Sequence, residues 1–382
     1  MKKVLFVIDS LACGGAEKSL ISLLSILDYS AMDVDLMTVK HGGIYEKLVP
    51  HEVHFVPIPK EPQWVFRLFQ SVFSLKIRLL RLFGISRHGA ETYWQMMSCA
   101  YLTPERDYDV AVAYQQGFPT YYVAKKVRAA KKWAWINSDM EKAGYRPRFN
   151  CSFYDQMTGV CVVSDALSCM LVNAGFVSSE RIRVIKDILN VDLIRKMADE
   201  SLDTLNCSAR FKILTVGRLV SPKNYPLAVE AADILRNKGL DFVWIFIGEG
   251  GERRNIEMLI QQKGLQKKVV LAGQKWNPYP YFKACDIYVQ TSSFEGFGLT
   301  ISEAKVFHKP IVTTNFPAAH DQITDGENGL IAEMTAESLA NKILSILENP
   351  DLKDKLVNGT RMEENRTAET ESARVIRLLL ED

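Results

Sequence analysis

The sequence lacks any hydrophobic run long enough to cross a membrane. A helix that spans a bilayer needs about 20 consecutive apolar residues, and none of the 382 residues belongs to such a window. Lys2 and Lys3, followed by the apolar run Val4–Ile8, resemble the beginning of a secretory signal, but the run is too short and Asp9 ends it. We therefore interpret Val4–Ile8 as a buried strand and expect a cytoplasmic protein.

The cysteines form neither of the patterns that give this residue a structural role. There are seven, an odd number, and no two of them stand in Cys-x-x-Cys spacing. This argues against a disulfide framework and against a zinc site, and it favours a reducing compartment. The seven positions are Cys13, Cys99, Cys151, Cys161, Cys169, Cys207 and Cys285.

Charge and glycine patterns exclude two further classes of protein. The formal net charge is +2, so the chain has no broad positive field of the kind that attracts nucleic acid, and we expect no nucleic-acid partner. No Gly-x-Gly-x-x-Gly follows the first predicted strand, which disfavours a NAD-dependent dehydrogenase.

Short apolar runs alternate with helical patterns, which is typical of βαβ units and a parallel sheet. The pattern restarts near Phe211, so we predict α/β domains over residues 1–188 and 189–365 and a final helix over 366–382 that packs back toward the first domain. Two such domains would face a cleft, and ligands bind at the carboxyl ends of strands. The expected strands are Val4–Ile8, Val34–Val39, Val53–Ile58, Val110–Tyr114, Trp133–Ile136, Val160–Val163, Phe211–Val216, Phe242–Ile247, Val269–Ala272, Ile287–Gln290 and Pro310–Thr313.

One segment after a predicted strand combines glycines, a helix start and two carboxylates. Phe294–Leu299 follows Ile287–Gln290 and opens a helix that continues through Glu303. Glycine lets the backbone approach a ligand closely, and a helix N-terminus favours phosphate. Glu295 and Glu303 can each accept the two hydroxyl donors of a vicinal diol. The segment predicts a site for a phosphorylated, hydroxyl-rich ligand, and the alternative is a plain strand–helix loop with a solvated glutamate.

Two cations follow the first strand of the second half. Gly217-Arg218-Leu219 ends this strand, and Lys223 lies five residues after Arg218. Arginine binds phosphate through its planar fork and lysine as a point charge, so the pair suits a diphosphate. Considered alone, the same residues are also compatible with a solvated surface pair.

Further motifs accompany these two segments in a characteristic order. They are Gly14-Gly15-Ala16-Glu17, Lys223-Asn224, Gly248-Glu249-Gly250, Glu303-Ala304, Pro310-Ile311-Val312 and Asp325-Gly326-Glu327-Asn328-Gly329-Leu330. In order, spacing and strand context, nearly the whole chain resembles the family-4 retaining glycosyltransferases of the GT-B fold. The resemblance implies two Rossmann-like parallel-sheet domains that face a central cleft.

The resemblance also implies a role for each matching residue. Arg218, Lys223 and Glu295 would form the catalytic set: the two cations neutralise the diphosphate of a nucleotide-sugar donor, and Glu295 contacts the donor sugar. Glu303 would hold the ribose, and Gly15 would approach the donor from the N-terminal domain. The other expected donor contacts are Gly217, Gly250, Gly296, Phe297, Gly298 and Leu299, with Gln274 and Lys275 in the loop 273–276 as candidates for the base.

The chain departs from the family pattern on the acceptor side. Trp135-Ile136-Asn137-Ser138-Asp139 resembles a family segment that often has histidine where Asn137 stands. Asparagine cannot shuttle a proton near neutral pH, so no side-chain base is assigned. We place Asn137 and Asp139 on the acceptor side, and we note that the family's usual Asn-Pro at the domain seam is replaced by Asn190-Val191-Asp192.

Asp-x-Asp is the metal-binding pattern of the other large glycosyltransferase fold, and it occurs twice here. Asp33/Asp35 and Asp107/Asp109 both stand where a predicted strand begins, whereas ligands bind where strands end. We therefore expect no metal and no cofactor. The resemblance further implies retention of the anomeric configuration through same-face attack.

Residues Gln63–Phe83 predict an amphipathic helix with a wide apolar face. Such a helix either faces a protein core or lies in a membrane interface. Six basic residues with only Glu61 among them favour the interface, at an anionic inner membrane face where a lipid-linked acceptor would fit. The basic residues are Lys60, Arg67, Lys76, Arg78, Arg81 and Arg87. The polar face consists of Gln63, Arg67, Gln70, Ser71, Ser74, Arg78 and Arg81, and the apolar face, with Lys76 in its middle, consists of Val65, Leu68, Phe69, Val72, Phe73, Leu75, Leu79, Leu80 and Phe83.

The resemblance implies transfer of a hexose-type sugar from a nucleotide-diphosphate donor to a glycan acceptor in cell-surface polysaccharide synthesis. A UDP-sugar is favoured by its frequency in the family. Two alternatives remain: a nucleotide-sugar 2-epimerase of the same fold, which needs the cations but no acceptor surface, and a non-catalytic sugar-nucleotide-binding protein. The presence of both cations and both glutamates favours transfer.

Overall fold

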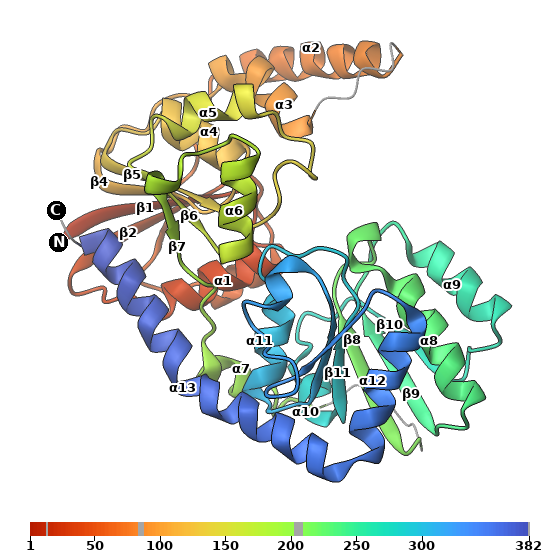
Figure 1. Cartoon of the computed structure of the whole chain (residues 1–382). Helices are drawn as coiled ribbons and strands as arrows, with labels where there is room; N and C mark the ends of the chain where they lie inside the picture. The colour runs from red at the N-terminus through yellow and green to blue at the C-terminus, as the bar shows by residue number, and fades with distance from the viewer. Residues whose placement is uncertain (13, 83–87, 202–208, 381–382) are drawn as a thin grey trace. The chain divides into compact units, whose positions relative to one another are not determined.

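The chain folds into two compact units, each built around one parallel sheet (Figure 1). The computed structural model describes residues 1–12, 14–82, 88–201 and 209–380. The first unit comprises Met1–Ile188 with Glu371–Asp382, and the second comprises Leu189–Thr370. The predicted α/β architecture with two parallel sheets is therefore confirmed.

The sheet of the first unit has the order β3-β2-β1-β4-β5-β6-β7. Its central strand β1 is apolar and completely buried over Val4–Ile8, as expected for a parallel strand covered on both faces. The strand order reverses between β1 and β4, so their carboxyl ends form the topological switch point of this sheet. The strands are β1 Lys2–Ile8, β2 Met32–Thr38, β3 His54–Phe55, β4 Tyr108–Ala113, β5 Ala129–Ile136, β6 Gly159–Val162 and β7 Ile182–Val184.

Strand β3 is much shorter than the predicted strand Val53–Ile58. Val56 still donates its N–H to the carbonyl of Leu36 at 3.0 Å, but only His54–Phe55 is a strand. Pro57 and Pro59 follow directly, and proline has no N–H to donate to a sheet, so the pairing ends there.

Helices connect these strands and supply much of the aromatic core of the first unit. Glu91 in α3 is fully buried and accepts hydrogen bonds from the backbone N–H of Arg146 at 2.7 Å and from Asn150 at 2.8 Å, which ties α3 to α5. The helices are α1 Gly15–Leu24, α2 Gln63–Leu82, α3 Gly89–Met97, α4 Phe118–Lys125, α5 Pro147–Tyr154 and α6 Asp165–Asn173, with the 3-10 turns η1 Ile44–Leu48, η2 Ser98–Ala100 and η3 Ser179–Arg181.

The sheet of the second unit has the order β10-β9-β8-β11-β12-β13. Its strands are β8 Phe211–Val216, β9 Phe242–Ile247, β10 Val269–Gly273, β11 Ile287–Gln290, β12 Ile311–Thr314 and β13 Leu330–Ala332. Its helices are α7 Val191–Met197, α8 Tyr225–Asn237, α9 Arg253–Gln262, α10 Tyr279–Ala284, α11 Leu299–Val306 and α12 Ala336–Glu348, with the turns η4 Ser221–Lys223 and η5 Pro317–Ala319.

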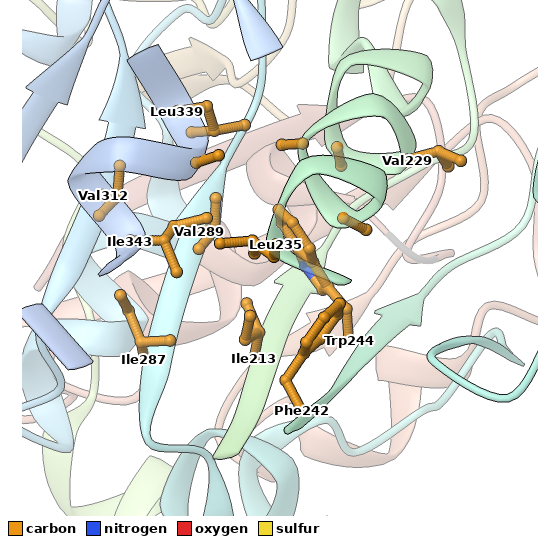
Figure 2. Close-up of a cluster of buried hydrophobic side chains, with 14 of the residues drawn as sticks. Ile213, Val229, Leu235, Phe242, Trp244, Ile287, Val289, Val312, Leu339 and Ile343 are labelled. Carbon is orange, nitrogen blue, oxygen red and sulfur yellow. The ribbon is translucent and has the colours of Figure 1, made fainter. Parts of the chain in front are cut away.

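A single apolar cluster joins this sheet to α8 and α12 (Figure 2). Ile213, Trp244 and Val289 point from three strands toward Leu235 of α8 and Ile343 of α12, and all five are essentially buried. The indole N–H of Trp244 donates to the Thr215 hydroxyl at 3.0 Å, so its one polar group is satisfied inside the core. This packing fixes the strands whose carboxyl ends carry the candidate site.

The last helix, α13 Pro350–Leu380, contributes to both units. Its final turns belong to the first unit, where Val375 and Leu379 are fully buried and Glu371 accepts a hydrogen bond from the backbone N–H of Lys186 at 3.2 Å.

Candidate functional site

The ends of β8 and β9 in the second unit are joined by backbone hydrogen bonds. Gly217 donates to the carbonyl of Ile247, and Leu219 donates to the carbonyl of Glu249, both at 2.9 Å. The two loops that follow these strands therefore form one edge of fixed geometry rather than two independent loops.

Two glycines allow this close backbone approach. A Cβ atom on Gly248 would lie 1.9 Å from the carbonyl oxygen of Gly217, and one on Gly250 would lie 2.3 Å from that of Leu219. Gly248 also has φ +150°, which side-chain-bearing residues rarely adopt. The predicted Gly248-Glu249-Gly250 motif therefore packs directly against the backbone of the Gly217–Leu219 loop.

Lys223 lies in the loop after β8 and reaches the loop after β11. Its Nζ donates to Oε1 of Glu295 at 2.5 Å, and the two side chains are only 19% and 13% exposed. A Cβ on Gly217 would lie 3.3 Å from Cε of Lys223, so glycine leaves room for the lysine stem. Arg218 is exposed, and no side chain in the described ranges forms an ion pair with it. The structure thus brings the predicted catalytic residues Lys223 and Glu295 into direct contact.

Glu295 also accepts hydrogen bonds from residues at the end of β11 and just after it. Its Oε1 accepts hydrogen bonds from Nε2 of Gln290 at 2.5 Å and from the hydroxyl of Ser292 at 2.6 Å, in addition to the one from Lys223. None of the described residues donates to the other carboxylate oxygen, Oε2. One oxygen is therefore saturated by the protein while the other remains available to a ligand.

The helix α11 begins four residues after Glu295, and its N-cap is a glycine in a left-handed conformation. Gly298 has φ +90° at the N-cap position, which explains why glycine stands there. The side-chain amide of Gln322 donates to the carbonyls of Phe297 at 2.5 Å and Gly298 at 3.2 Å and so fixes this turn. The N–H groups of the first turn, at Leu299 and beyond, give this end of the helix partial positive charge.

Glu303 lies further along α11 and is fully buried. Its Oε1 accepts a hydrogen bond from the hydroxyl of Tyr279 in α10 at 3.0 Å. Because Glu303 has no exposed surface, a ligand contacts it only when neighbouring side chains move.

The loop 273–276 follows β10 at the edge of the same sheet. Gly273 accepts a hydrogen bond from the N–H of Gly248 at 3.0 Å, which links this loop to the one after β9. Gln274 is exposed, Lys275 is half-buried, and the indole of Trp276 is 52% exposed. The candidate base-binding residues therefore lie beside the Gly248–Gly250 loop.

The predicted residues of the first unit lie where its strands end. Gly15 is the first residue of α1, and Asn137 directly follows β5. Nδ2 of Asn137 donates to the carbonyl of Tyr114 at 3.0 Å, while its Oδ1 is buried without a donor from the described part of the chain. Asp139 is nearly buried and accepts a hydrogen bond from the N–H of Lys142 at 3.0 Å, a contact that stabilises its own turn.

The Asp-x-Asp residues form ion pairs and backbone contacts. Arg106 binds Asp35 through two hydrogen bonds of 2.9 and 3.0 Å and also pairs with Asp33. Asp107 pairs with Arg128, and Asp109 accepts from a backbone N–H at 2.7 Å. Among the residues that the structure describes, no group of three His, Cys, Asp or Glu side chains is placed to hold a metal ion. The described cysteines are free thiols: Cys99, Cys151, Cys161, Cys169 and Cys285; Cys13 and Cys207 lie outside the described residues.

Helix α2 presents three different faces, and it projects beside α3 in Figure 1. One face is half-buried, because Phe66 contacts Tyr101 and Phe73 contacts Tyr93 in edge-to-face geometry, with ring centroids 5.5 and 5.3 Å apart. A second face is polar and carries Arg67. Between them runs an exposed apolar stripe, here named the α2 stripe, which consists of Trp64, Leu68, Val72, Leu75 and Leu82.

One part of the apolar face thus packs against the protein, as the core-facing interpretation predicts, while membrane binding through the exposed α2 stripe stays a prediction. Phe83 and Arg87 lie outside the described residues, as do the side chains of Leu79, Leu80 and Arg81. Within the described ranges, no helix combines the length and the hydropathy needed to cross a bilayer.

Sequence reasoning did not identify four residues that shape the site. Gln290 and Ser292 bind Glu295, Tyr279 orients Glu303, and Gln322 fixes the start of α11. Only the position of Gln290 was informative in the sequence, because a polar residue at the end of a buried strand lies next to the loop that follows it.

Comparison with known proteins relates the chain to glycosyltransferases. Residues 204–363 match the family described as glycosyl transferases group 1. The chain is 25% identical, over 94% of both lengths, to the N-acetylgalactosamine-N,N'-diacetylbacillosaminyl-diphospho-undecaprenol 4-alpha-N-acetylgalactosaminyltransferase of Campylobacter jejuni. It is 31% identical to the lipopolysaccharide core biosynthesis glycosyltransferase LpsE of Rhizobium meliloti, over 38% of this chain and 42% of that one.

A solved structure supports the fold assignment. Anabaena Alr3699/HepE in complex with UDP-glucose superposes with a TM-score of 0.77 over 99% of both chains, at 18% identity. The fold is therefore that of the GT-B glycosyltransferases, and the matches to named enzymes support a glycosyltransferase in which residues 204–363 are similar to the group 1 glycosyl transferases.

Proposed function

We propose that this glycosyltransferase transfers a hexose-type sugar from a UDP-sugar, with retention and without a metal ion, to a lipid-linked glycan of a cell-surface polysaccharide. The observation that carries the proposal is the contact between Lys223 and Glu295 where β8 and β11 end, beside the start of α11. Two relatives suggest the substrates: the structural neighbour is titled as a UDP-glucose complex, and the Campylobacter relative is named for an undecaprenol-linked acceptor.

The cations suit the charge that develops on the leaving group. Breaking the bond between sugar and phosphate places negative charge on the diphosphate, and donors that are already in position stabilise it without reorganising. The Lys223 ammonium has three N–H groups, and one of them is used by Glu295, which leaves two for phosphate oxygens. Arg218 adds a planar fork with no competing carboxylate among the described residues.

Glu295 suits the sugar half of the donor. Its unoccupied Oε2 can accept a sugar hydroxyl, and its negative charge favours the positive charge that develops on the anomeric carbon. Glu303, displaced from its contact with Tyr279, would accept the ribose hydroxyls.

Retention is proposed from the resemblance to the retaining family, together with a proton path that needs no side-chain base. Asn137 stands where a histidine is common in the family, and an amide does not take up a proton near neutral pH. In the proposed mechanism the hydroxyl of the acceptor attacks from the face that the phosphate leaves, and its proton passes to the departing phosphate oxygen. One C–O bond breaks and one forms on the same face of the sugar.

The membrane side of the proposal rests on the α2 stripe. Trp64 is 73% exposed and Leu68 is 59% exposed, and an apolar face of this kind inserts into the interfacial layer of a bilayer. Lys60, Arg67 and Arg78 accompany it, and basic residues are attracted to anionic lipid. A lipid-linked acceptor is presented at such a surface.

Donor specificity is tested with a panel of nucleotide sugars. UDP-glucose, UDP-galactose, UDP-N-acetylglucosamine, UDP-N-acetylgalactosamine, GDP-mannose and dTDP-glucose are compared by release of the nucleoside diphosphate. We expect turnover with a UDP-sugar and its loss in Lys223→Ala, with Lys238→Ala, at the exposed C-cap of α8, as the matched control. Turnover confined to GDP-mannose or dTDP-glucose contradicts the UDP assignment, and an inverted product in the NMR spectrum contradicts retention.

Membrane binding is tested by sedimentation with phosphatidylglycerol-containing and pure phosphatidylcholine vesicles. We expect binding only to the anionic vesicles, weaker at high salt, and reduced in Leu68→Gln and in Arg67→Gln. Met258→Gln and Arg254→Gln change exposed residues of α9 in the same way and serve as controls. Equal sedimentation with both vesicle types, or none with either, excludes α2 as an anionic-membrane anchor.

A further inference from the structure

Gln290 is the last residue of β11, and every donor and acceptor of its side-chain amide has a hydrogen-bond partner. The residue is 1% exposed. Its Nε2 donates to Glu295 at 2.5 Å and to the hydroxyl of Ser292 at 2.8 Å. Its Oε1 accepts from the hydroxyl of Thr300 at 3.0 Å and from that of Tyr288. Both N–H groups and both lone pairs of the amide therefore have partners.

This one side chain joins three parts of the site. Tyr288 belongs to β11, Glu295 to the loop after it, and Thr300 to the first turn of α11. Only an amide donates twice and accepts twice, so no carboxylate or apolar residue can replace it. An apolar side chain would leave the hydroxyls of Tyr288 and Thr300 without their partner in a buried place, which is unfavourable.

Lys223 cannot set the orientation of Glu295 by itself. Its ammonium is a point charge on a flexible stem, which attracts a carboxylate without fixing the rotation of the group. Gln290 and Ser292 both bind the same oxygen, Oε1, from the sheet side. Their position turns Oε1 toward the strand end and leaves Oε2 as the oxygen that a ligand can reach.

We propose that Gln290 is a positioning residue for sugar transfer, which holds the Glu295 carboxylate and the first turn of α11 in one fixed arrangement. The proposal rests on the proposed function, in which Glu295 contacts the donor sugar. Gln290 itself does not touch the substrate; it determines which oxygen of Glu295 does. Small displacements of such a group reduce the rate strongly, because transfer depends on the alignment of the reacting atoms.

The test combines kinetics with a double-mutant cycle. Gln290→Met keeps the length of the side chain and removes its four hydrogen bonds. We expect kcat with the preferred UDP-sugar to fall about tenfold or more, while the Kd for UDP, which has no sugar, changes less than about twofold. In a Glu295→Gln background, Gln290→Met should reduce kcat by less than about twofold, because the carboxylate that it positions is already gone. Gln262→Met, on the exposed surface of α9, controls for the amide-to-thioether change.

A second variant keeps the proposal testable if Gln290→Met folds poorly. Thr300→Val removes only the hydroxyl group that donates to Oε1 of Gln290. It should lower kcat about threefold in the wild-type background and leave kcat unchanged in the Glu295→Gln background. An equal loss of kcat in both backgrounds, or a weaker affinity for UDP with unchanged kcat, overturns the positioning role. If Glu295→Gln itself turns over UDP-sugar like the wild type, the proposed function fails at Glu295, and the proposal for Gln290 falls with it.

Discussion

Gly248→Ala places a methyl group where two strand-end loops touch. The new Cβ atom would lie 1.9 Å from the carbonyl oxygen of Gly217 and 2.8 Å from its carbonyl carbon. Both are backbone atoms, so no side chain can move aside to relieve the clash. Gly217 directly precedes Arg218, and the same displacement would therefore move the loop that carries the proposed diphosphate-binding cations.

The expected loss of stability has two parts. A residue other than glycine at φ +150° costs about 1–3 kcal/mol of backbone strain. Forcing a methyl group into a filled space costs about another 1–3 kcal/mol. A total of about 3 kcal/mol lowers the melting temperature of a domain of this size by roughly 6–12 °C.

The same loop offers a matched control. A Cβ atom on Gly251 would meet nothing within 4 Å, and its φ is not in the left-handed region. Calorimetry should therefore show a large decrease in melting temperature for Gly248→Ala and almost none for Gly251→Ala. The kcat/KM for the donor should follow the same order. Equal melting temperatures for the two variants would refute the close approach of the Gly217 and Gly248 backbones.

Three further predictions follow from the site and from one buried carboxyl group. Glu303→Gln should raise the donor KM with little change in kcat, whereas Glu295→Gln should lower kcat; the reverse pattern in steady-state kinetics would exchange their roles. Transfer should persist in excess EDTA, and a loss of activity that Mg²⁺ or Mn²⁺ restores would contradict metal independence. Burial raises the pKa of Asp187 to about 6. Because its native pKa exceeds the unfolded value, ionisation of Asp187 destabilises the native state as the pH rises from about 4 to about 6, and the cost remains above that range. Asp187→Asn should therefore gain stability over the wild type in denaturant titrations at pH 7.5 but much less at pH 4; an equal difference at both pH values would contradict this.

The sequence was most informative for strands that are largely apolar and buried. Phe211–Val216, Phe242–Ile247 and Ile287–Gln290 are strands with the predicted limits. Most residues of these strands are buried, so the mainly apolar run of each one marks the extent of the strand. The strand β13 at Leu330–Ala332 was not predicted, because three residues are too few to show a periodicity.

The last helix shows a different reason for a wrong limit. We expected it from about residue 366, but α13 begins at Pro350. Gly359 stands in its first half, and glycine disfavours helix in sequence-based reasoning. In the structure a Cβ atom at Gly359 would lie 2.1 Å from the carbonyl oxygen of Glu327, so this glycine is required by packing and does not end the helix.

In the site, charge and spacing indicated which residues are involved but not how they are arranged. The sequence predicted Lys223 for the phosphate and Glu295 for the sugar, 72 positions apart. Their mutual contact depends on the adjacent ends of β8 and β11, which the strand order determines and the sequence does not display. The hydrogen bonds of Gln290 were not predictable either, since its place at the end of a strand does not show which groups its amide contacts.

The most direct test of the donor-binding claim is the affinity for UDP measured by isothermal titration calorimetry in the wild type and in Arg218→Ala. Arg218 is exposed, so its substitution should not disturb the fold. A charge-assisted contact with the diphosphate is worth about 1.5–3 kcal/mol, so the Kd for UDP should rise roughly tenfold to a hundredfold. Arg254→Ala, an exposed arginine on α9, should bind UDP like the wild type. The same Kd for UDP in Arg218→Ala and in the wild type would contradict a diphosphate site at the end of β8.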